Sequence, residues 1–272
     1  MNKETTSELT PEQIAEVEAK RKREAAELER MRLNKVLIKV KNDVEKQKRA
    51  FPDLTNEQVY SYHSNVLVHI ANEICLRQQR RKLEIDGDNK LIFKFLLYYF
   101  NDCPLAETVF PGKHYKLEKN LLITGKAGVG KTLMMQIFSE YLRYTDNPNF
   151  FHNLSVTQMV NYYTIHSNLD RYTYNEENST GFQPNPVNVC LNDIGLESRL
   201  HYGQDTKILT NDFLHARNEI WTQSAPDRRK FAHLTTNLSV AQLKEEFKDA
   251  FGRLVDRFKT YNIIELKGSS RR

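Results

Sequence analysis

The sequence is poor in the residues that mark several protein classes. It has 3 Cys, 8 Pro and 10 Gly among 272 residues. The low glycine and proline counts exclude collagen-like and low-complexity chains. The three cysteines (Cys75, Cys103 and Cys190) are odd in number and share no metal-binding or redox spacing. We therefore expect reduced thiols in a cytoplasmic protein.

Long apolar runs are also missing. The longest, Leu91 to Phe100, is interrupted by Lys94 and is too short to cross a bilayer. The first ten residues are polar and lack the apolar core of a secretory signal. We expect neither a transmembrane helix nor a membrane partner.

The composition that remains is globular. Hydrophobic residues make up 39% of the chain, and 14 Phe and 13 Tyr can fill a sizeable core, which argues against intrinsic disorder. The length fits one large domain or two modest ones. The formal net charge of +5 permits contact with nucleic acid without predicting it.

The N-terminal third is predicted to be helical. Thr10-Pro11 can begin a helix that extends to about Ala50, and Phe51-Pro52 then breaks it. Apolar residues at helical spacing give this helix one stripe: Leu33, Val36, Leu37, Val40 and Val44. Arg21 and Glu24 fall at heptad positions where a coiled coil needs apolar residues, so a long coiled coil is disfavoured.

A second amphipathic helix is predicted after the break. Thr55 and Gln58 form a possible capping box, and the helix ends in the basic run 80–82. The apolar stripes of both helices must be buried against the chain itself or against a partner protein. The sequence leaves these two alternatives open.

The remainder of the chain alternates between short apolar strands and helices. The change follows the turn signal Asp86-Gly87-Asp88, and the alternation is typical of an α/β domain with a parallel sheet. We expect strands near residues 121–124, 149–154, 187–191, 230–236 and 262–266. This gives a helical domain over residues 1–84 and an α/β domain over residues 85–272.

A phosphate-binding loop follows the first of these strands. The pattern G-x-x-x-x-G-K-[ST], known as Walker A, is matched by Gly125-Lys126-Ala127-Gly128-Val129-Gly130-Lys131-Thr132. Glycines allow the backbone to wrap round a polyphosphate, and the following helix adds a favourable dipole. Lys131 supplies charge at the β and γ phosphates, and the Thr132 hydroxyl ligates Mg²⁺. The sequence therefore predicts binding of ATP with Mg²⁺.

Polar residues are expected beside this loop at the ends of two other strands. Asp193 and Glu197 follow the third strand and are the available carboxylates. One carboxylate is needed to hold Mg²⁺, directly or through water, and another is needed to activate the attacking water. Asn237 follows the fourth strand. Its amide can orient the lytic water, or it can cap the next helix.

Two arginines precede the last strand. Arg253 and Arg257 are four residues apart and therefore share one face of a helix. They can form surface ion pairs, or one can act as an arginine finger on the nucleotide of a neighbouring subunit. Further back, Arg171, Tyr172 and Tyr174 combine a cation with stacking rings, the chemistry that single-stranded nucleic acid needs. An ordinary exposed loop is the alternative there.

Taken in order, the motifs resemble those of a known family. The chain carries GKAGVGKT, LNDIGLE, HLTTNLS, GRLVDRF and KGSSRR. Their order and spacing, over about residues 91–272, are similar to those of bacterial helicase-loader ATPases of the DnaC/DnaI type. These are AAA+ proteins, and the transposition ATPase IstB is their close relative. The N-terminal third resembles the family only in being a small helical domain, which in the family docks on the replicative DnaB-type helicase.

The resemblance implies a five-stranded parallel sheet in the order 5-1-4-3-2 without a C-terminal lid domain. It implies self-association through ATP at subunit interfaces, with single-stranded DNA in a central channel. Carried over by motif, Asn237 corresponds to sensor 1, Arg257 to the arginine finger, and Arg253 to the second arginine of that helix. The expected function is therefore ATP-dependent loading of a helicase for DNA replication. An IstB-type transposition helper and an ATP-binding adaptor with little hydrolysis are the alternatives.

One position departs from the family pattern. Asn192 stands where the family usually has the acidic residue on the Mg²⁺ side, in the motif called Walker B, so that Asp193 falls on the catalytic acid. An amide is a weak Mg²⁺ ligand and carries no charge. We therefore expect slow hydrolysis with intact ATP binding, and we expect Asn192→Asp to raise the rate.

Overall fold

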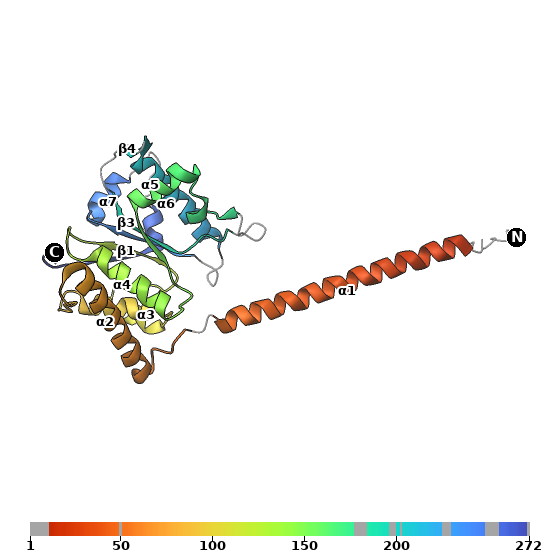
Figure 1. Ribbon diagram of the computed structural model, residues 1–272, viewed down its shortest axis with the longest axis horizontal. Coiled ribbons are helices and arrows are strands. Elements are labelled where there is room, and N and C mark those ends of the chain that lie inside the picture. Colours follow the sequence, from red (N-terminus) through yellow and green to blue (C-terminus); the bar gives the residue numbers. More distant parts are fainter. Residues whose placement is uncertain are drawn as a thin grey trace. The chain divides into compact units, whose positions relative to one another are not determined.

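The computed structural model describes residues 11–48, 51–176, 184–195, 200–201, 203–224, 230–247 and 256–270. The chain divides into two compact units, residues 1–50 and residues 51–272. The first unit contains one long helix, α1 (Pro11–Lys48; Figure 1). The described side chains of α1 are exposed, including the apolar residues Leu28, Met31, Leu33, Val36, Leu37 and Ile38. The side chains of Val40 and Val44, which belong to the predicted stripe, lie outside the described ones.

The second unit is built on a parallel sheet of five strands. They are β1 (Asn120–Thr124), β2 (His152–Ser155), β3 (Val189–Ile194), β6 (Ala232–Thr236) and β7 (Tyr261–Glu265). The spatial order is β2-β3-β6-β1-β7. Counted along the chain, this is the predicted order 5-1-4-3-2, which is confirmed. All four pairings are parallel, so the carboxyl ends of the strands share one edge.

Helices cover both faces of this sheet (Figure 1). They are α2 (Glu57–Gln79), α3 (Lys90–Phe100), α4 (Lys131–Tyr144), α5 (Val156–His166), α6 (Thr206–Gln223) and α7 (Val240–Glu246). Side chains of a strand alternate between faces, so Leu121 and Ile123 join the core beneath α2, α3 and α4. Leu122 joins the core beneath α5, α6 and α7.

Short elements connect these parts. Three 3-10 helices are η1 (Pro104–Thr108), η2 (Asp170–Tyr172) and η5 (Phe258–Thr260). A small antiparallel pair that the sequence analysis did not predict is β4 (Leu200–His201) with β5 (Gln204–Asp205). None of the described helices is long and apolar enough to cross a membrane.

The second helix belongs to the same compact unit as the sheet. α2 buries Leu67, Ala71 and Cys75 and packs along α4. The division between compact units therefore falls at residues 50/51, whereas the sequence analysis put the domain boundary at 84/85. The reason is that the apolar stripe of α2 is buried on the α/β core. That residues 1–84 act together in docking a partner stays a prediction.

The cap of α2 corrects one local prediction. Asn56 caps α2, because its side-chain oxygen accepts hydrogen bonds from the backbone N–H groups of Gln58 and Val59. The predicted capping box of Thr55 and Gln58 is therefore wrong, and the Thr55 hydroxyl donates to Asp53 instead. Ser155 caps α5, because its side chain accepts the backbone N–H of Gln158.

Candidate functional site

The phosphate loop lies between the end of β1 and the start of α4, as the motif predicts. Gly125, Gly128 and Gly130 all have positive φ, at 153°, 84° and 98°. A Cβ atom on Gly125 would lie 2.4 Å from the backbone oxygen of Leu266, and one on Gly128 would lie 2.4 Å from the Ser270 hydroxyl oxygen. Only glycine suits both the backbone conformation and these close approaches.

The loop lysine points back across the loop. The Lys131 ammonium donates to the backbone oxygens of Gly125 (2.8 Å) and Lys126 (2.9 Å) and to the Asn237 side-chain oxygen (2.7 Å). The side chain is 4% exposed. These acceptors keep a buried cation satisfied at the position where a polyphosphate would meet it.

Residues predicted from three separate motifs line one cavity of about 260 Å³. Its wall includes Gly128, Lys131 and Thr132 from the loop, together with Asp193 and Asn237 from the ends of β3 and β6. Asn237 therefore lies at the loop lysine, while the cap of α7 is Ser239. The arrangement offers backbone N–H groups, one ammonium, one hydroxyl and one carboxylate.

These groups fit a magnesium–nucleotide complex. Among the described residues, no group of three or more His, Cys, Asp or Glu side chains could hold a metal ion by itself. Mg²⁺ in phosphate sites needs only one or two protein oxygens, because substrate phosphates and water supply the others. Thr132 and Asp193 line the same cavity and can be those oxygens.

The end of β3 has an unusual backbone. The pairing of β3 with β6 shifts register between Leu191 and Ile194. Inside this bulge, Asp193 has a φ of 59°, which non-glycine residues rarely adopt. The neighbouring Asn192 is 2% exposed and is hydrogen-bonded to side chains of both adjacent strands.

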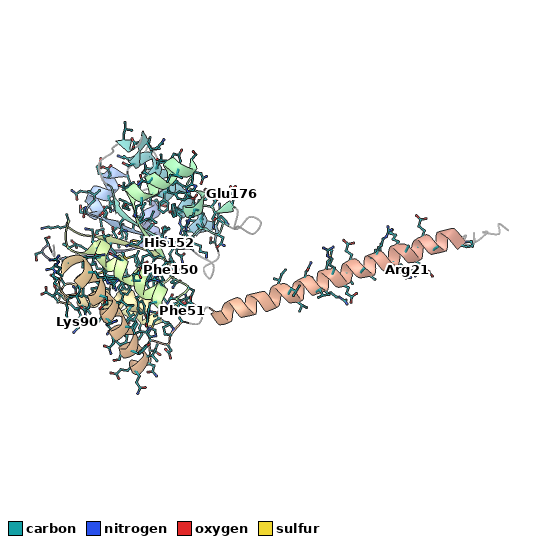
Figure 2. The ribbon with its side chains drawn as sticks, viewed as in Figure 1. Arg21, Phe51, Lys90, Phe150, His152 and Glu176 are labelled. Atoms are coloured by element: carbon teal, nitrogen blue, oxygen red, sulfur yellow. The ribbon has the colours of Figure 1, made fainter. Side chains whose placement is uncertain are left out.

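Asp193 also borders a second polar cavity, of about 440 Å³, beside β2. Thr132 and Asn192 line it, together with Phe150 and His152, which are labelled in Figure 2. The Phe150 and His152 rings meet edge to face with centroids 5.2 Å apart. Burial and the nearby Arg171 guanidinium lower the pKa of His152, which favours the neutral form of this ring.

The structure places Arg257 away from the loop. Arg257 lies just before η5, at the amino end of β7. The phosphate loop follows the carboxyl end of β1, which is the parallel neighbour of β7. Its guanidinium contacts His215 of α6, and burial lowers its pKa. Arg253 and Glu197 lie outside the described residues.

The aromatic residues considered for nucleic-acid contact have partners within the protein. The Tyr174 hydroxyl donates to the Glu219 carboxylate at 2.7 Å, which raises the pKa of Tyr174 to about 12. Tyr172 meets the Tyr162 ring edge to face, with centroids 4.8 Å apart. Of the three residues, Arg171 is the exposed one.

Some residues of the site could not be found from the sequence. Gln78 and Gln79, at the end of α2, line the 260 Å³ cavity together with Gln136 of α4. Ser270, near the carboxyl end of the chain, lies against Gly128. The three glutamines belong to no motif, whereas Ser270 lies in the KGSSRR motif, to which the sequence analysis gave no role at the loop.

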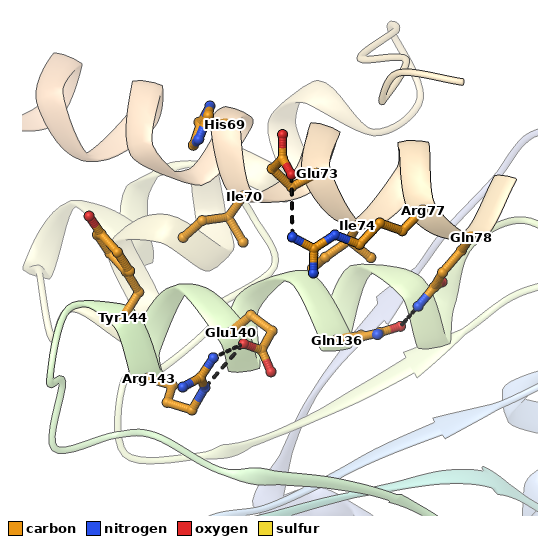
Figure 3. A pocket seen from close by; sticks show the side chains of 10 residues that line it. All are labelled: His69, Ile70, Glu73, Ile74, Arg77, Gln78, Gln136, Glu140, Arg143 and Tyr144. Atoms are coloured by element: carbon orange, nitrogen blue, oxygen red, sulfur yellow. Dashed lines mark hydrogen bonds and ion pairs between the residues drawn. The ribbon is translucent and has the colours of Figure 1, made fainter. Parts of the chain in front are cut away.

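A groove between α2 and α4 extends from this site (Figure 3). Its volume is about 680 Å³, and Ile70 and Ile74 form its apolar floor. At one end, Gln78 donates to the Gln136 side-chain oxygen at 3.0 Å (Figure 3). The phosphate cavity and the groove therefore share these two glutamines.

Comparisons with known proteins found similarity to solved structures. No protein-family model and no curated protein matches the sequence. The chain is similar to the DnaC helicase loader, with 16% identity, a TM-score of 0.43, and coverage of 68% of this chain and 93% of that one. It is similar to a proposed primosome component from Streptococcus pyogenes serotype M3, with 15% identity, a TM-score of 0.39, and coverage of 69% and 84%. It is also similar to AMPPCP-bound DnaA from Aquifex aeolicus, with 17% identity, a TM-score of 0.40, and coverage of 68% and 48%.

These superpositions are partial, and the sheet itself identifies the fold. Its five parallel strands have the predicted order, and the Walker A loop joins β1, which lies between β6 and β7, to α4. The second unit of this chain is an α/β domain with a five-stranded parallel sheet of the predicted order and a Walker A loop.

Proposed function

We propose that this protein binds ATP with Mg²⁺ and hydrolyses it. The observation that carries the proposal is the single cavity lined by Lys131, Thr132, Asp193 and Asn237, which come from three separate motifs. A glycine-rich turn without a binding role would not be expected to lie beside a carboxylate and an amide from the ends of two other strands.

Each residue has a distinct task in this proposal. Lys131 neutralises charge on the β and γ phosphates, and the loop N–H groups hold the phosphate oxygens. Thr132 and Asp193 hold Mg²⁺, which supplies positive charge at the transferring phosphoryl group. Asn237 orients the attacking water next to Lys131, and Asp193 is also the carboxylate available to accept its proton.

The first test is binding of ATP and its turnover. The wild-type chain should bind ATP in a Mg²⁺-dependent manner, and Lys131→Ala should abolish binding. The exposed Lys126→Ala, within the same loop, is the matched control and should bind ATP within a few-fold of wild type. Equal ATP affinity of wild type and Lys131→Ala would contradict the proposal.

We further propose that the protein is a loader for a replicative DnaB-type helicase. The order and spacing of the five motifs support this proposal, as does a long helix with exposed apolar side chains. Such a helix can dock its apolar face on a partner protein. Single-stranded DNA and other copies of this chain are the further proposed partners.

A light-scattering experiment on a sizing column tests this role. The protein is mixed with the replicative helicase of its organism, with and without ATP and Mg²⁺. We expect a complex that Leu33→Glu and Leu37→Glu weaken at least about tenfold, since each removes an exposed apolar contact. Lys35→Glu on the same helix is the control and should leave the complex intact.

Two alternatives predict other outcomes. An IstB-type transposition helper should form no such complex and should assemble with ATP on duplex DNA. An adaptor should bind ATP and a partner without appreciable turnover, a possibility that Asn192 in the Walker B position favours.

A further inference from the structure

A chain of hydrogen bonds crosses three strands at the end of β3. The side-chain N–H₂ group of Asn192 donates to the Asn153 side-chain oxygen (2.5 Å) and the Leu154 backbone oxygen (3.1 Å), both in β2. The Thr235 hydroxyl in β6 donates to the Asn192 side-chain oxygen (3.1 Å). The same hydroxyl accepts the backbone N–H of Asp193 (3.1 Å).

The last of these bonds compensates for the bulge. The register shift between Leu191 and Ile194 takes Asp193 out of the regular pairing with β6, and its φ is 59°. A non-glycine residue in the left-handed region is strained and persists where its surroundings hold it. The fully buried Thr235 hydroxyl supplies the acceptor that the interrupted pairing no longer offers.

The same chain of bonds explains an amide at position 192. The Leu154 backbone oxygen in β2 can only accept a hydrogen bond, so the Asn192 side chain must donate on that side. It must also accept from Thr235 on the other side. An amide does both, whereas an ionised carboxylate only accepts and would meet the Leu154 oxygen without a proton between them.

We propose that Asn192 and Thr235 are positioning residues that hold Asp193 at the end of β3, where its carboxylate serves Mg²⁺. This inference rests on the proposed ATPase function. It reverses one expectation from the sequence: Asn192 is not a weakened metal ligand, and Asn192→Asp should lower activity rather than raise it.

The first measurement needs no nucleotide. The exchange rate of the Asp193 amide hydrogen is followed by NMR in the full-length protein. Thr235→Val should speed exchange at least about tenfold because it removes the acceptor, and Thr235→Ser should keep it near wild type. The matched control is Thr236→Val, since Thr236 is equally buried in the same strand but bonds Ile194 and Leu238. An unchanged rate in Thr235→Val would overturn the proposal.

The second measurement compares ATP affinity with and without Mg²⁺, and then kcat. Thr235→Val and Asn192→Asp should lose most of the Mg²⁺-dependent gain in ATP affinity, and kcat should fall about tenfold to a hundredfold because a misplaced group is costly. Thr235→Ser should keep the Mg²⁺-dependent gain in ATP affinity and kcat near their wild-type values. A rise in kcat with Asn192→Asp would overturn the positioning role. If wild type binds no ATP, the ATPase proposal fails, and the exchange rates still decide whether Thr235 holds Asp193.

Discussion

At the scale of single residues, the structure favours one of two interpretations that the sequence leaves open for Asn237. Two interpretations were open, a helix cap and a group that acts on water. Its side-chain oxygen accepts from Lys131, and Ser239 is the cap of α7. The hydrogen bond favours the second interpretation, because a cap would direct this oxygen to the backbone of α7.

Asn237→Ala should therefore reduce turnover more than binding. We expect kcat to fall at least about tenfold, since the water loses its orienting group, while the dissociation constant for ATP changes only a few-fold. Steady-state kinetics and equilibrium binding of ATP check this. The control is Asn168→Ala, at an exposed asparagine outside the cavity. Equal losses in binding and kcat would assign Asn237 to ground-state binding instead.

The buried histidine of β6 gives a prediction about stability. His233 is fully buried, and its Nδ1 accepts the backbone N–H of Leu121 at 3.2 Å. Burial, helped by the Arg217 guanidinium, lowers the pKa of His233 from 6.5 to about 3. Below pH 6.5 the unfolded chain therefore binds a proton that the native protein does not.

The free energy of unfolding should fall as the pH decreases from 6.5 towards 3, by a few kcal/mol at most from this group. His233→Phe leaves the Leu121 N–H without its acceptor, which costs about 1–3 kcal/mol at pH 7. Its stability should nevertheless depend less on pH between 6.5 and 4. Urea unfolding across this range measures the slope, with the exposed His69→Gln in α2 as control. Equal slopes for wild type and His233→Phe would refute the assignment.

At the scale of elements, the strands and the phosphate loop could be predicted from sequence because their signals are local. Apolar runs marked all five sheet strands to within a few residues, and glycine spacing marked the loop. The bulge at Asp193 and the glutamines of α2 in the cavity could not be predicted, because each depends on a neighbour distant in sequence. Asn192 shows the same limit: its role depends on acceptors in β2 that no local pattern reveals.

The packing of α2 predicts different results for two truncations. Deleting residues 1–50 removes one compact unit and should leave the melting temperature of the rest within a few degrees. Deleting residues 1–82 also removes α2 and uncovers α4, and should lower the melting temperature by at least about 10 °C, since three buried side chains of α2 are lost. Thermal unfolding followed by circular dichroism distinguishes the two. Similar melting temperatures would show that α2 contributes little to the core.

At the scale of the whole molecule, the two ends of the sheet have different proposed tasks. The phosphate loop follows the carboxyl end of β1, and Arg257 precedes the amino end of the parallel neighbour β7. Five strand residues separate these two edges, a span of about 13 Å before the loop is added. Arg257 is thus far from the phosphate loop of its own chain, and we propose that it serves the nucleotide site of a neighbouring copy.

Mixing two inactive variants tests this arrangement. Arg257→Ala should bind ATP but lose most hydrolysis, because an arginine finger contributes about 10³–10⁵ in rate. Lys131→Ala should bind no ATP but retain Arg257. A mixture of the two should regain part of the activity, since the second variant can supply its arginine to ATP held by the first. Mixing Arg257→Ala with the double variant Lys131→Ala/Arg257→Ala should regain none. If the first mixture also stays inactive while light scattering shows mixed oligomers, Arg257 does not act between subunits, and its contact with His215 is its structural role.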